Sequence, residues 1–312
     1  MRIGVMGAGA IGGYLAARLV AAGENVALIA RGAHLEAIRE RGLQLRSELG
    51  DALVRPAVAT GDPQEVGTVD VLLFTVKLYD SATALQAALP MVGPDTRVVT
   101  FQNGIDGVQI LARTLGSERV AGGAAHIPVQ IEAPGVIRHP ARLARFVIGA
   151  LTGGHDQRVA DLGHALTVAG VEVALSEKIE RELWEKFVML AAWSGVSAVT
   201  RGSFAIVRRS EATCTMLAEA VHEAAAVAAA KAIALPPGCT ERIIRFLLEQ
   251  AADEVKASQT HDLEAGRRLE LPWLSGAVVR MGQELGVSTP THRFICSALA
   301  PYVDGRPDML GN

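Results

Sequence analysis

The chain begins, after Met1, with Arg2-Ile3-Gly4-Val5-Met6-Gly7-Ala8-Gly9-Ala10-Ile11-Gly12. This stretch predicts a short buried strand that runs into a glycine turn, and residues 14–22 then predict a helix. Gly7 permits a tight bend, Gly9 lets the backbone approach a pyrophosphate, and Gly12 lets the helix pack close to the strand. A second apolar strand follows at residues 25–30. We therefore interpret residues 7–12 as the dinucleotide-binding turn of a βαβ unit; the alternative is a turn that only eases packing.

The residue after the second strand indicates which dinucleotide binds. An NAD site usually carries Asp or Glu there, which accepts hydrogen bonds from the ribose, whereas this chain has Arg31. A guanidinium suits a 2′-phosphate, and the next acidic residue, Glu36, lies inside the following predicted helix, residues 33–41. We predict NADP(H) as the cofactor. The alternative is that Arg31 is a solvated loop residue.

Length and composition exclude several classes of function. A chain of 312 residues is long enough for two domains. Its 30 basic and 33 acidic residues give a net charge of −3 without a long basic run, which disfavours nucleic acid or an anionic membrane as partner. The three cysteines are isolated, so we predict neither a disulfide framework nor a metal site. With no apolar run of membrane-spanning length, we expect a cytoplasmic protein that acts on a small molecule.

The first half of the chain alternates strand and helix patterns. Continuous apolar runs at residues 71–76 and 97–101 are typical of parallel strands covered on both faces. Short strand-like pieces between residues 120 and 148 are typical of antiparallel additions to the sheet edge. A helix at residues 158–169 and a strand at residues 171–174 complete the pattern. We predict an α/β, Rossmann-type, doubly wound sheet that binds NADP(H) over residues 1–176.

The second half carries long helical patterns, most clearly at residues 210–234 and 240–259, and we expect a loose tail at residues 305–312. This composition predicts an all-α domain over residues 177–312 that supplies the substrate and catalytic residues. Apolar periodicity serves packing within one subunit and across a homodimer equally, so the homodimer is a hypothesis only.

A lysine in the predicted helix 179–194 stands in an apolar setting. The helical neighbours of Lys186 are apolar apart from Glu182: they are Leu183, Met189, Leu190 and Trp193. Such a lysine must extend to solvent, pair with a carboxylate or titrate low, and the last two would suit a proton donor to a carbonyl. Glu270, at the start of a helix marked by Pro272, is a candidate carboxylate.

Two further polar residues follow predicted strands. Lys77 comes after residues 71–76, and Asn103 comes shortly after residues 97–101. Because carboxyl ends of parallel strands meet at one sheet edge, we expect both beside the glycine turn, with Lys77 as a cofactor contact. Taken alone, each could equally be an ordinary surface or turn residue.

Together these residues resemble the 2-dehydropantoate 2-reductase, or ketopantoate reductase, family over nearly the whole chain. The matching pieces, in order, are Gly7 to Gly12, Arg31, Val76-Lys77, Asn103-Gly104, Glu182 to Lys186, Ser258, Glu270 and Gly276. The resemblance implies a Rossmann domain followed by a helical domain, and NADPH-dependent reduction of ketopantoate to pantoate on the route to pantothenate.

The resemblance also implies roles for the matching residues. Lys186 would be the general acid that protonates the carbonyl oxygen, and Asn103 would hold substrate and nicotinamide. Glu270 would contact the nicotinamide ribose and orient the site, which makes Asn103 and Glu270 both catalytic and cofactor-binding. Ser258 would bind substrate.

The chain departs from the family pattern on the lysine-bearing helix. The family usually carries asparagines four and eight residues after the lysine, where this chain has Leu190 and Ser194, and Ser275 replaces a frequent Asn before Gly276. We assign Ser194 to substrate binding with Lys186 and Ser258. Two alternatives stay open: a reductase of another 2-oxo acid, because an amide is lost at Leu190, and a non-catalytic NADP(H)-sensing protein.

Overall fold

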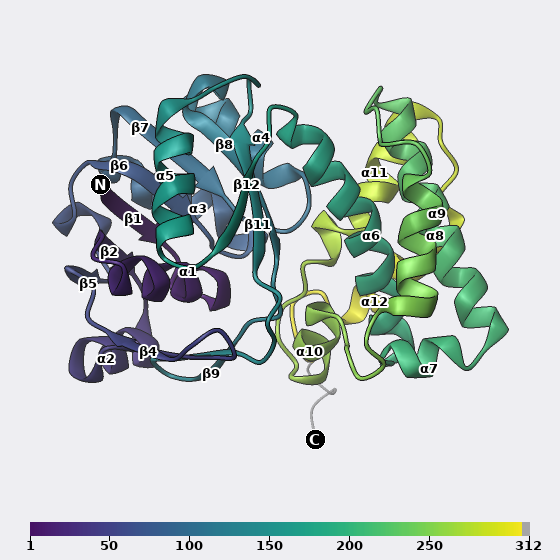
Figure 1. Ribbon diagram of the computed structural model, residues 1–312. Coiled ribbons are helices and arrows are strands. Elements are labelled where there is room, and N and C mark those ends of the chain that lie inside the picture. The colour runs from purple at the N-terminus through teal and green to yellow at the C-terminus, as the bar shows by residue number, and fades with distance from the viewer. Residues whose placement is uncertain (308–312) are drawn as a thin grey trace. The chain divides into compact units, whose positions relative to one another are not determined.

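The computed structural model describes residues 1–307, which pack into two compact units (Figure 1). The first unit comprises residues 1–102 and 106–182, and the second comprises residues 103–105 and the chain from residue 183 onward. The fold class predicted from the sequence is confirmed: an α/β unit with a Rossmann-type sheet and an all-helical unit. The expected boundary between residues 176 and 177 stays a prediction, and the expected tail lies outside the described residues from 308 onward.

An eight-stranded sheet forms the centre of the first unit, in the order β12-β11-β8-β7-β6-β1-β2-β5. All neighbours are parallel except β11, which runs antiparallel to β8. The strands are β1 (Arg2–Met6), β2 (Asn25–Ile29), β5 (Val58–Thr60), β6 (Val69–Phe74), β7 (Val92–Thr100), β8 (Val120–His126), β11 (Arg145–Ala150) and β12 (Glu172–Leu175). The central strands β1 and β6 are buried on both faces, as their apolar runs predict.

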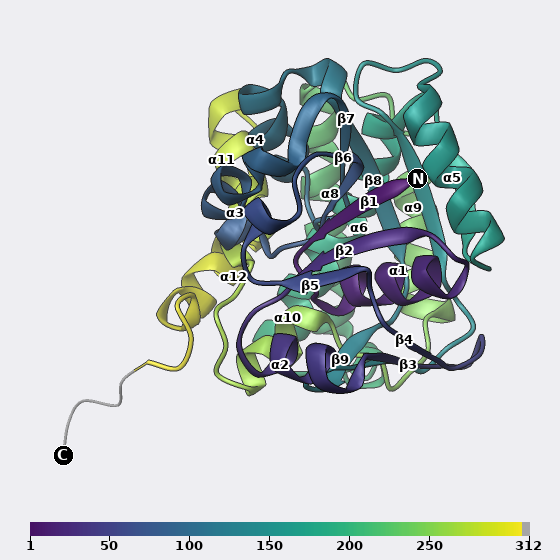
Figure 2. The same cartoon turned by 90° about the vertical axis from the view of Figure 1, so that its left-hand side faces the viewer.

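Five helices flank this sheet: α1 (Ala10–Ala21), α2 (Gly32–Arg41), α3 (Ser81–Ala88), α4 (Asp106–Leu115) and α5 (Gln157–Val168). Helix α1 packs beside α5, and α3 packs beside α4. Figure 2 shows the two pairs on opposite faces of the sheet, which is the doubly wound arrangement. The carboxyl ends of the parallel strands β1, β2, β6 and β7 therefore meet at one edge, where the glycine turn lies.

A second, four-stranded sheet corrects the expectation for residues 120–148. Strand β8 is parallel and internal, and only β11 is an antiparallel addition to the main sheet. The other pieces, β9 (Gln130–Ala133) and β10 (Val136–His139), pair with the unpredicted β3 (Leu43–Ser47) and β4 (Ala52–Val54). This sheet buries its apolar side on α1: a Cβ at Gly13 would lie 2.7 Å from Ile137. Covering α1 is the physical reason that these strands leave the main sheet.

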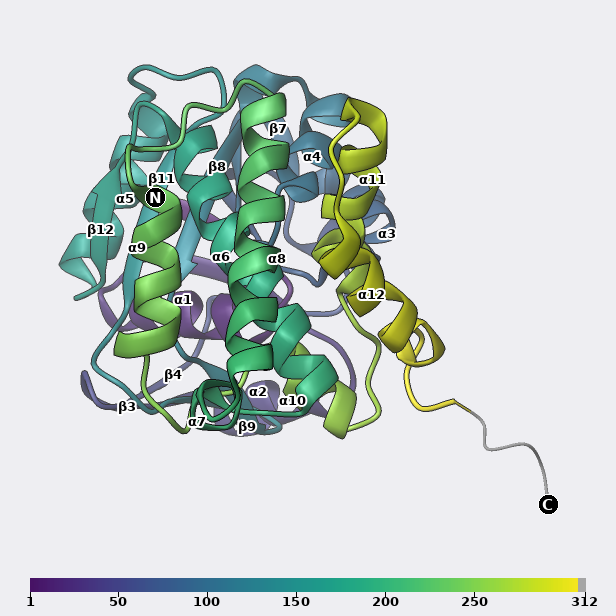
Figure 3. The ribbon, with the colours of Figure 1, turned by 90° about the vertical axis from the view of Figure 1, so that its right-hand side faces the viewer.

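The second unit is helical, with α6 (Ile179–Thr200) beginning just before it. Its other helices are α7 (Phe204–Arg208), α8 (Glu211–Ala230), α9 (Cys239–Arg245), α10 (Ser258–Glu264), α11 (Ser275–Leu285) and α12 (Pro290–Leu299). Helix α8 lies between α9 on one side and α11 with α12 on the other (Figure 3). Among residues 1–307, none of these helices is long and apolar enough to cross a membrane, and no cluster of His, Cys, Asp or Glu could hold a metal ion.

The single helix expected over residues 240–259 is wrong. Helix α9 passes into a π-helical turn, Phe246–Gln250, after which the chain leaves the helix until Ser258. Hydrogen bonds from α7 stabilise this non-helical segment. Arg208 donates to the Leu247 carbonyl, and the N–H groups of Phe204 and Ala205 donate to carbonyls in residues 253–255. Tertiary hydrogen bonds thus replace the intrahelical ones, and α10 starts anew at Ser258.

Candidate active site

The three glycines of the turn after β1 have different surroundings. Gly7 has a φ of 100°, which only glycine adopts readily. A Cβ at Gly12 would lie 2.1 Å from the Gly7 carbonyl oxygen, so no side chain fits there, whereas a Cβ at Gly9 would meet only the Thr75 carbonyl, at 3.9 Å. The space beside Gly9 is therefore open to a ligand, while Gly12 is a packing contact.

Hydrogen bonds hold this turn against the neighbouring strands. The Ala8 N–H donates to the Ile29 carbonyl over 3.0 Å, and the Thr75 hydroxyl donates to the Gly7 carbonyl over 2.7 Å. Helix α1 begins right after Gly9 with no acidic residue in its first turn. Its first N–H groups have no partner within the helix, so they form a ready site for an anion such as a pyrophosphate.

Arg31 follows β2 at the same edge of the sheet. Its side chain is exposed, and its guanidinium forms no ion pair with any residue in the part of the chain that the structure describes. The following helix α2 has no acidic residue in its first turn. A fixed positive charge without an internal partner is suited to a phosphate monoester.

Lys77 lies where the sequence places it, just beyond β6, and it is half-buried. Gln102, which sequence reasoning missed, ties the ends of two strands together here. Its amide nitrogen donates to the Val76 carbonyl over 2.9 Å and to the Ser81 hydroxyl over 2.7 Å. These contacts span more than twenty residues of sequence, and no local pattern marks them.

His34 is a second residue that the sequence did not indicate. Its Nδ1 accepts a hydrogen bond from the Gly135 N–H over 3.0 Å, which joins α2 to the four-stranded sheet. Burial lowers the pKa of His34, and the nearby Ala8 backbone opposes that shift in part. His34 is therefore neutral at neutral pH, so it contributes a structural contact beside the glycine turn and no positive charge toward an anion.

In the second unit, Lys186 meets Asn103. The Lys186 Nζ donates to the Asn103 Oδ1 over 3.2 Å, although 83 residues separate them in the sequence. Residues 103–105 follow β7 in the chain but pack with the second unit, and Asn103 there lies beside Lys186. The sequence predicted both residues, but not that they touch.

The charge of Lys186 depends on burial and on Glu270. Burial lowers the pKa of Lys186 to about 8, and the negative charge of Glu270 opposes this shift. Glu270 is 5% exposed and precedes the short helical turn Leu271–Trp273, as Pro272 indicated. Lys186, Asn103 and Glu270 thus form one group, in which a lysine holds a proton that it can release near neutral pH.

Packing of α6 fixes the direction of the Lys186 side chain. Trp184 and Phe187, on either side of it in sequence, are buried and meet edge to face with centroids 5.4 Å apart. Glu185 accepts from Arg242 over 2.9 Å, which joins α6 to α9. With these neighbours anchored in the core, the half-buried Lys186 is directed to the opposite side of the helix.

Two predicted substrate residues lie in contrasting environments. Ser194 is 1% exposed, and its hydroxyl donates to the Leu190 carbonyl over 2.7 Å. Ser258, the first residue of α10, is exposed. Their roles in substrate binding stay predictions.

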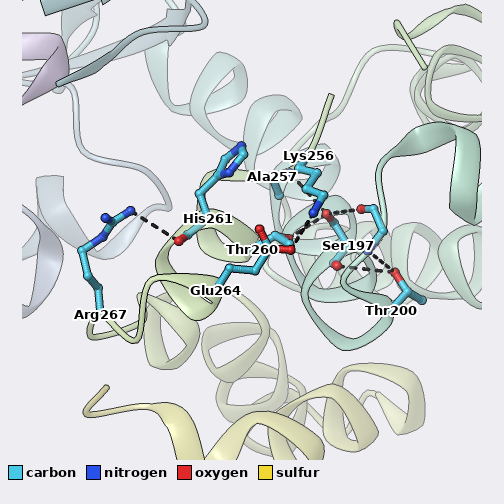
Figure 4. Close-up of polar contacts among 9 residues, drawn as sticks. Ser197, Thr200, Lys256, Ala257, Thr260, His261, Glu264 and Arg267 are labelled. Atoms are coloured by element: carbon cyan, nitrogen blue, oxygen red, sulfur yellow. Dashed lines mark hydrogen bonds and ion pairs between the residues drawn. The ribbon is translucent and has the colours of Figure 1, made fainter. Parts of the chain in front are cut away.

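A hydrogen-bond network between α6 and the start of α10 positions Ser258 (Figure 4). The buried Ser197 hydroxyl lies 2.7 Å from the Thr260 hydroxyl and accepts from the Ala257 N–H over 3.2 Å. Lys256 pairs with Glu264 over 2.5 Å across the same turn. The network holds the residues on both sides of Ser258 and leaves its own side chain accessible.

The sequence profile of a known family covers both units. The profile described as ketopantoate reductase PanE/ApbA matches residues 3–153, and that of its C-terminal part matches residues 178–303. The chain belongs to this family. Its members are oxidoreductases, and the resemblance drawn from the glycine turn, Lys186 and Glu270 is confirmed.

Individual family members match nearly the whole chain. A 2-dehydropantoate 2-reductase of Mesorhizobium japonicum is 33% identical over 93% of this chain and 94% of its own length. The crystal structure of a PanE/ApbA family ketopantoate reductase from Ralstonia eutropha JMP134 has a TM-score of 0.89 at 31% identity, covering 97% of this chain and 98% of that one. A D-mandelate dehydrogenase solved with NADH and anilino(oxo)acetate has a TM-score of 0.87 at 23% identity, which shows the same fold.

Proposed function

We propose that this chain uses NADPH to reduce the keto group of a 2-oxo acid, with Lys186 as the proton donor. The observation that carries this proposal is the Lys186–Asn103 hydrogen bond of 3.2 Å beside the buried Glu270. A lysine whose pKa is about 8 is largely protonated at neutral pH and gives up its proton more readily than an ordinary lysine.

The proton transfer follows from the donors available. The Lys186 ammonium has three N–H groups, and Asn103 accepts from one of them, which leaves others for the substrate carbonyl oxygen. As negative charge builds on that oxygen, Lys186 stabilises it and then transfers the proton. Glu270 keeps the lysine charged before the reaction, because its carboxylate offsets part of the cost of burial.

The first unit fits the cofactor. The open space beside Gly9 and the first turn of α1, which has no acidic residue, suit a pyrophosphate. The Arg31 guanidinium, which forms no ion pair within residues 1–307, suits a 2′-phosphate. Lys77 would add a positive charge at the same edge. NADPH, when bound, supplies the hydride that the carbonyl carbon receives.

The relatives support 2-dehydropantoate as the first substrate to test. The Mesorhizobium japonicum protein is named for this reaction. In this chain the product would be pantoate, on the route to pantothenate. A second candidate is another 2-oxo acid, and one observation favours it: Leu190, one helical turn from Lys186, presents a half-buried hydrocarbon side chain.

The test is NADPH oxidation, followed by its absorbance, with 2-dehydropantoate and a panel of 2-oxo acids. NADH serves as the control cofactor. Turnover with 2-dehydropantoate and NADPH supports the first candidate, and turnover with a different 2-oxo acid alone replaces the substrate but keeps the chemistry. Tight NADPH binding without any turnover would contradict the proposal and favour a sensing protein.

A further inference from the structure

The side of helix α6 that carries Lys186 continues toward its C-terminal end with Leu190 and Ser194. On a helix of 3.6 residues per turn, positions four and eight residues onward lie on the same side, about 6 and 12 Å along the axis. A substrate whose carbonyl meets Lys186 would therefore place its remaining atoms near Leu190 first.

Neither position offers a hydrogen-bond donor to a ligand. Leu190 is half-buried and purely hydrocarbon, so part of its side chain is accessible but cannot pair with a polar group. The Ser194 hydroxyl is buried, and its proton is committed to the Leu190 carbonyl of the preceding turn, 2.7 Å away. Beyond Lys186, at Leu190 and Ser194, this side of the helix therefore presents no free hydrogen-bond donor to a ligand, although Ser194 is polar in sequence.

Polar atoms nearby do not compensate for this. The Ser197 hydroxyl donates to the Gly202 carbonyl and pairs with Thr260, as Figure 4 shows in part. Gln259 Oε1 and Ser275 Oγ have no hydrogen-bond partner among residues 1–307, but both atoms are inaccessible, and the Gln259 amide nitrogen donates to the Ser194 carbonyl. Neither atom is exposed to a ligand in this arrangement of the helices.

Every 2-oxo acid carries a keto oxygen and a carboxylate. The keto oxygen matches Lys186 with Asn103, and the predicted partner of the carboxylate is Ser258, whose side chain is exposed. A third polar group on the substrate, placed at Leu190, would be desolvated without a partner.

We infer that Leu190 selects a 2-oxo acid whose side chain is hydrocarbon and lacks a hydroxyl. This inference rests on the proposed function and specifies its substrate class. An apolar pocket discriminates against an added hydroxyl only modestly, by roughly tenfold to a hundredfold, whereas a pocket built around a hydroxyl rejects its absence much more strongly. The protein should therefore prefer the hydroxyl-free compound and still reduce the hydroxylated one slowly.

The test compares 2-dehydropantoate with 3,3-dimethyl-2-oxobutanoate, which has hydrogen in place of the hydroxyl and is otherwise identical. We expect a higher kcat/KM for 3,3-dimethyl-2-oxobutanoate with NADPH. A higher kcat/KM for 2-dehydropantoate would overturn the inference and leave the proposed function standing. No reduction of these two compounds or of any other 2-oxo acid in the panel, with NADPH or NADH, would remove the proposed function and the inference together.

A pair of variants tests the residue itself. Leu190→Asn supplies an amide with the same number and branching of side-chain heavy atoms, so the ratio of kcat/KM values should move toward 2-dehydropantoate by about tenfold or more. Leu190→Met keeps an apolar side chain of similar size and should keep the wild-type ratio. Fluorescence titration with NADPH checks that both variants are folded. An unchanged ratio in a folded Leu190→Asn protein, or an equal shift in Leu190→Met, contradicts the assignment.

Discussion

Two regions of the molecule differ in how closely they follow the residues expected for the family. They are the glycine turn of the first unit and the Lys186 side of α6 in the second unit. At the turn, Gly7 has its left-handed φ, Gly12 has no room for a side chain, and the space at Gly9 is open. On α6, Lys186 keeps its partners, but the next turn presents Leu190. Every reduction of a 2-oxo acid by a nicotinamide cofactor needs the same hydride and proton transfer, whereas the substrate side chain varies from one 2-oxo acid to another. The region suited to the cofactor keeps its expected residues, and the region beyond the proton donor does not.

The largest expected effect is on the chemical step. Lys186→Ala removes the proton donor, so kcat should fall by roughly 10²- to 10⁴-fold, while the Kd for NADPH should change little, because we propose that its phosphates bind at the glycine turn and Arg31. Stopped-flow measurement of NADPH oxidation gives the rate, and fluorescence titration gives the Kd for NADPH. Lys178→Ala, at an exposed lysine, is the control and should keep its activity. Near-normal turnover of Lys186→Ala would remove the lysine from the mechanism.

Two glycine variants separate packing from ligand approach. Gly12→Ala places a Cβ against the Gly7 carbonyl and the Thr75 hydroxyl, so it should destabilise the protein by roughly 1–3 kcal/mol and weaken NADPH binding. Gly9→Ala meets nothing closer than 3.9 Å and should keep its Tm, yet it should weaken NADPH binding about tenfold or more by filling the open space. Thermal unfolding and titration test both. Unchanged NADPH affinity in Gly9→Ala would show that the pyrophosphate binds elsewhere.

Arg31 tests which dinucleotide the first unit selects. Because a hydrogen bond to a charged group contributes about 1.5–3 kcal/mol, Arg31→Ala should raise the Kd for NADPH by roughly 10- to 100-fold. The Kd for NADH, which has no 2′-phosphate, should stay within a factor of two or so. Arg41→Ala, at an exposed arginine that pairs with Glu40, is the matched control. Equal losses for both cofactors would argue against 2′-phosphate recognition.

A pH dependence is the last expected effect, and it is small up to pH 8. The pKa of Lys186 is lowered to about 8, so its protonated form, the donor in reduction, is depleted above that pH. The kcat/KM for the 2-oxo acid should fall about tenfold per pH unit above pH 8, while oxidation of the 2-hydroxy acid with NADP⁺, which needs the neutral amine, should rise through the same range. A profile that stays flat to pH 9.5 would contradict this assignment.

Much of the fold could be predicted because its signals are local. The apolar runs at β1 and β6 and the glycines between β1 and α1 identify the doubly wound unit, and helical periodicity identifies most of the second unit. The four-stranded sheet was missed because β3 and β4 are short and are stabilised by α1 and β10, far away in sequence. The break after Gln250 was missed because Arg208 and α7 create it through tertiary hydrogen bonds.

In the candidate site, too, the residue types could be predicted from local sequence, but the contacts between them could not. Lys186, Asn103 and Glu270 could each be identified from a residue type and its neighbours, but their grouping depends on contacts across 83 or more residues. Gln102 and His34 act through partners that no sequence spacing indicates. The engaged hydroxyl of Ser194 is also invisible in the sequence, since a serine at that position is equally able to bind a ligand or its own helix.

The assignment of residues 103–105 to the helical unit matters for anyone who recombines genes of this family. A cut between residues 182 and 183 would look like a clean module boundary, yet it leaves Asn103 on one fragment and Lys186 on the other. A chimera that exchanges only the C-terminal fragment would pair a lysine from one parent with an asparagine loop from the other. Functional modules are therefore discontinuous in this chain, and a transplant of the helical unit must carry the tripeptide Asn103-Gly104-Ile105 with it.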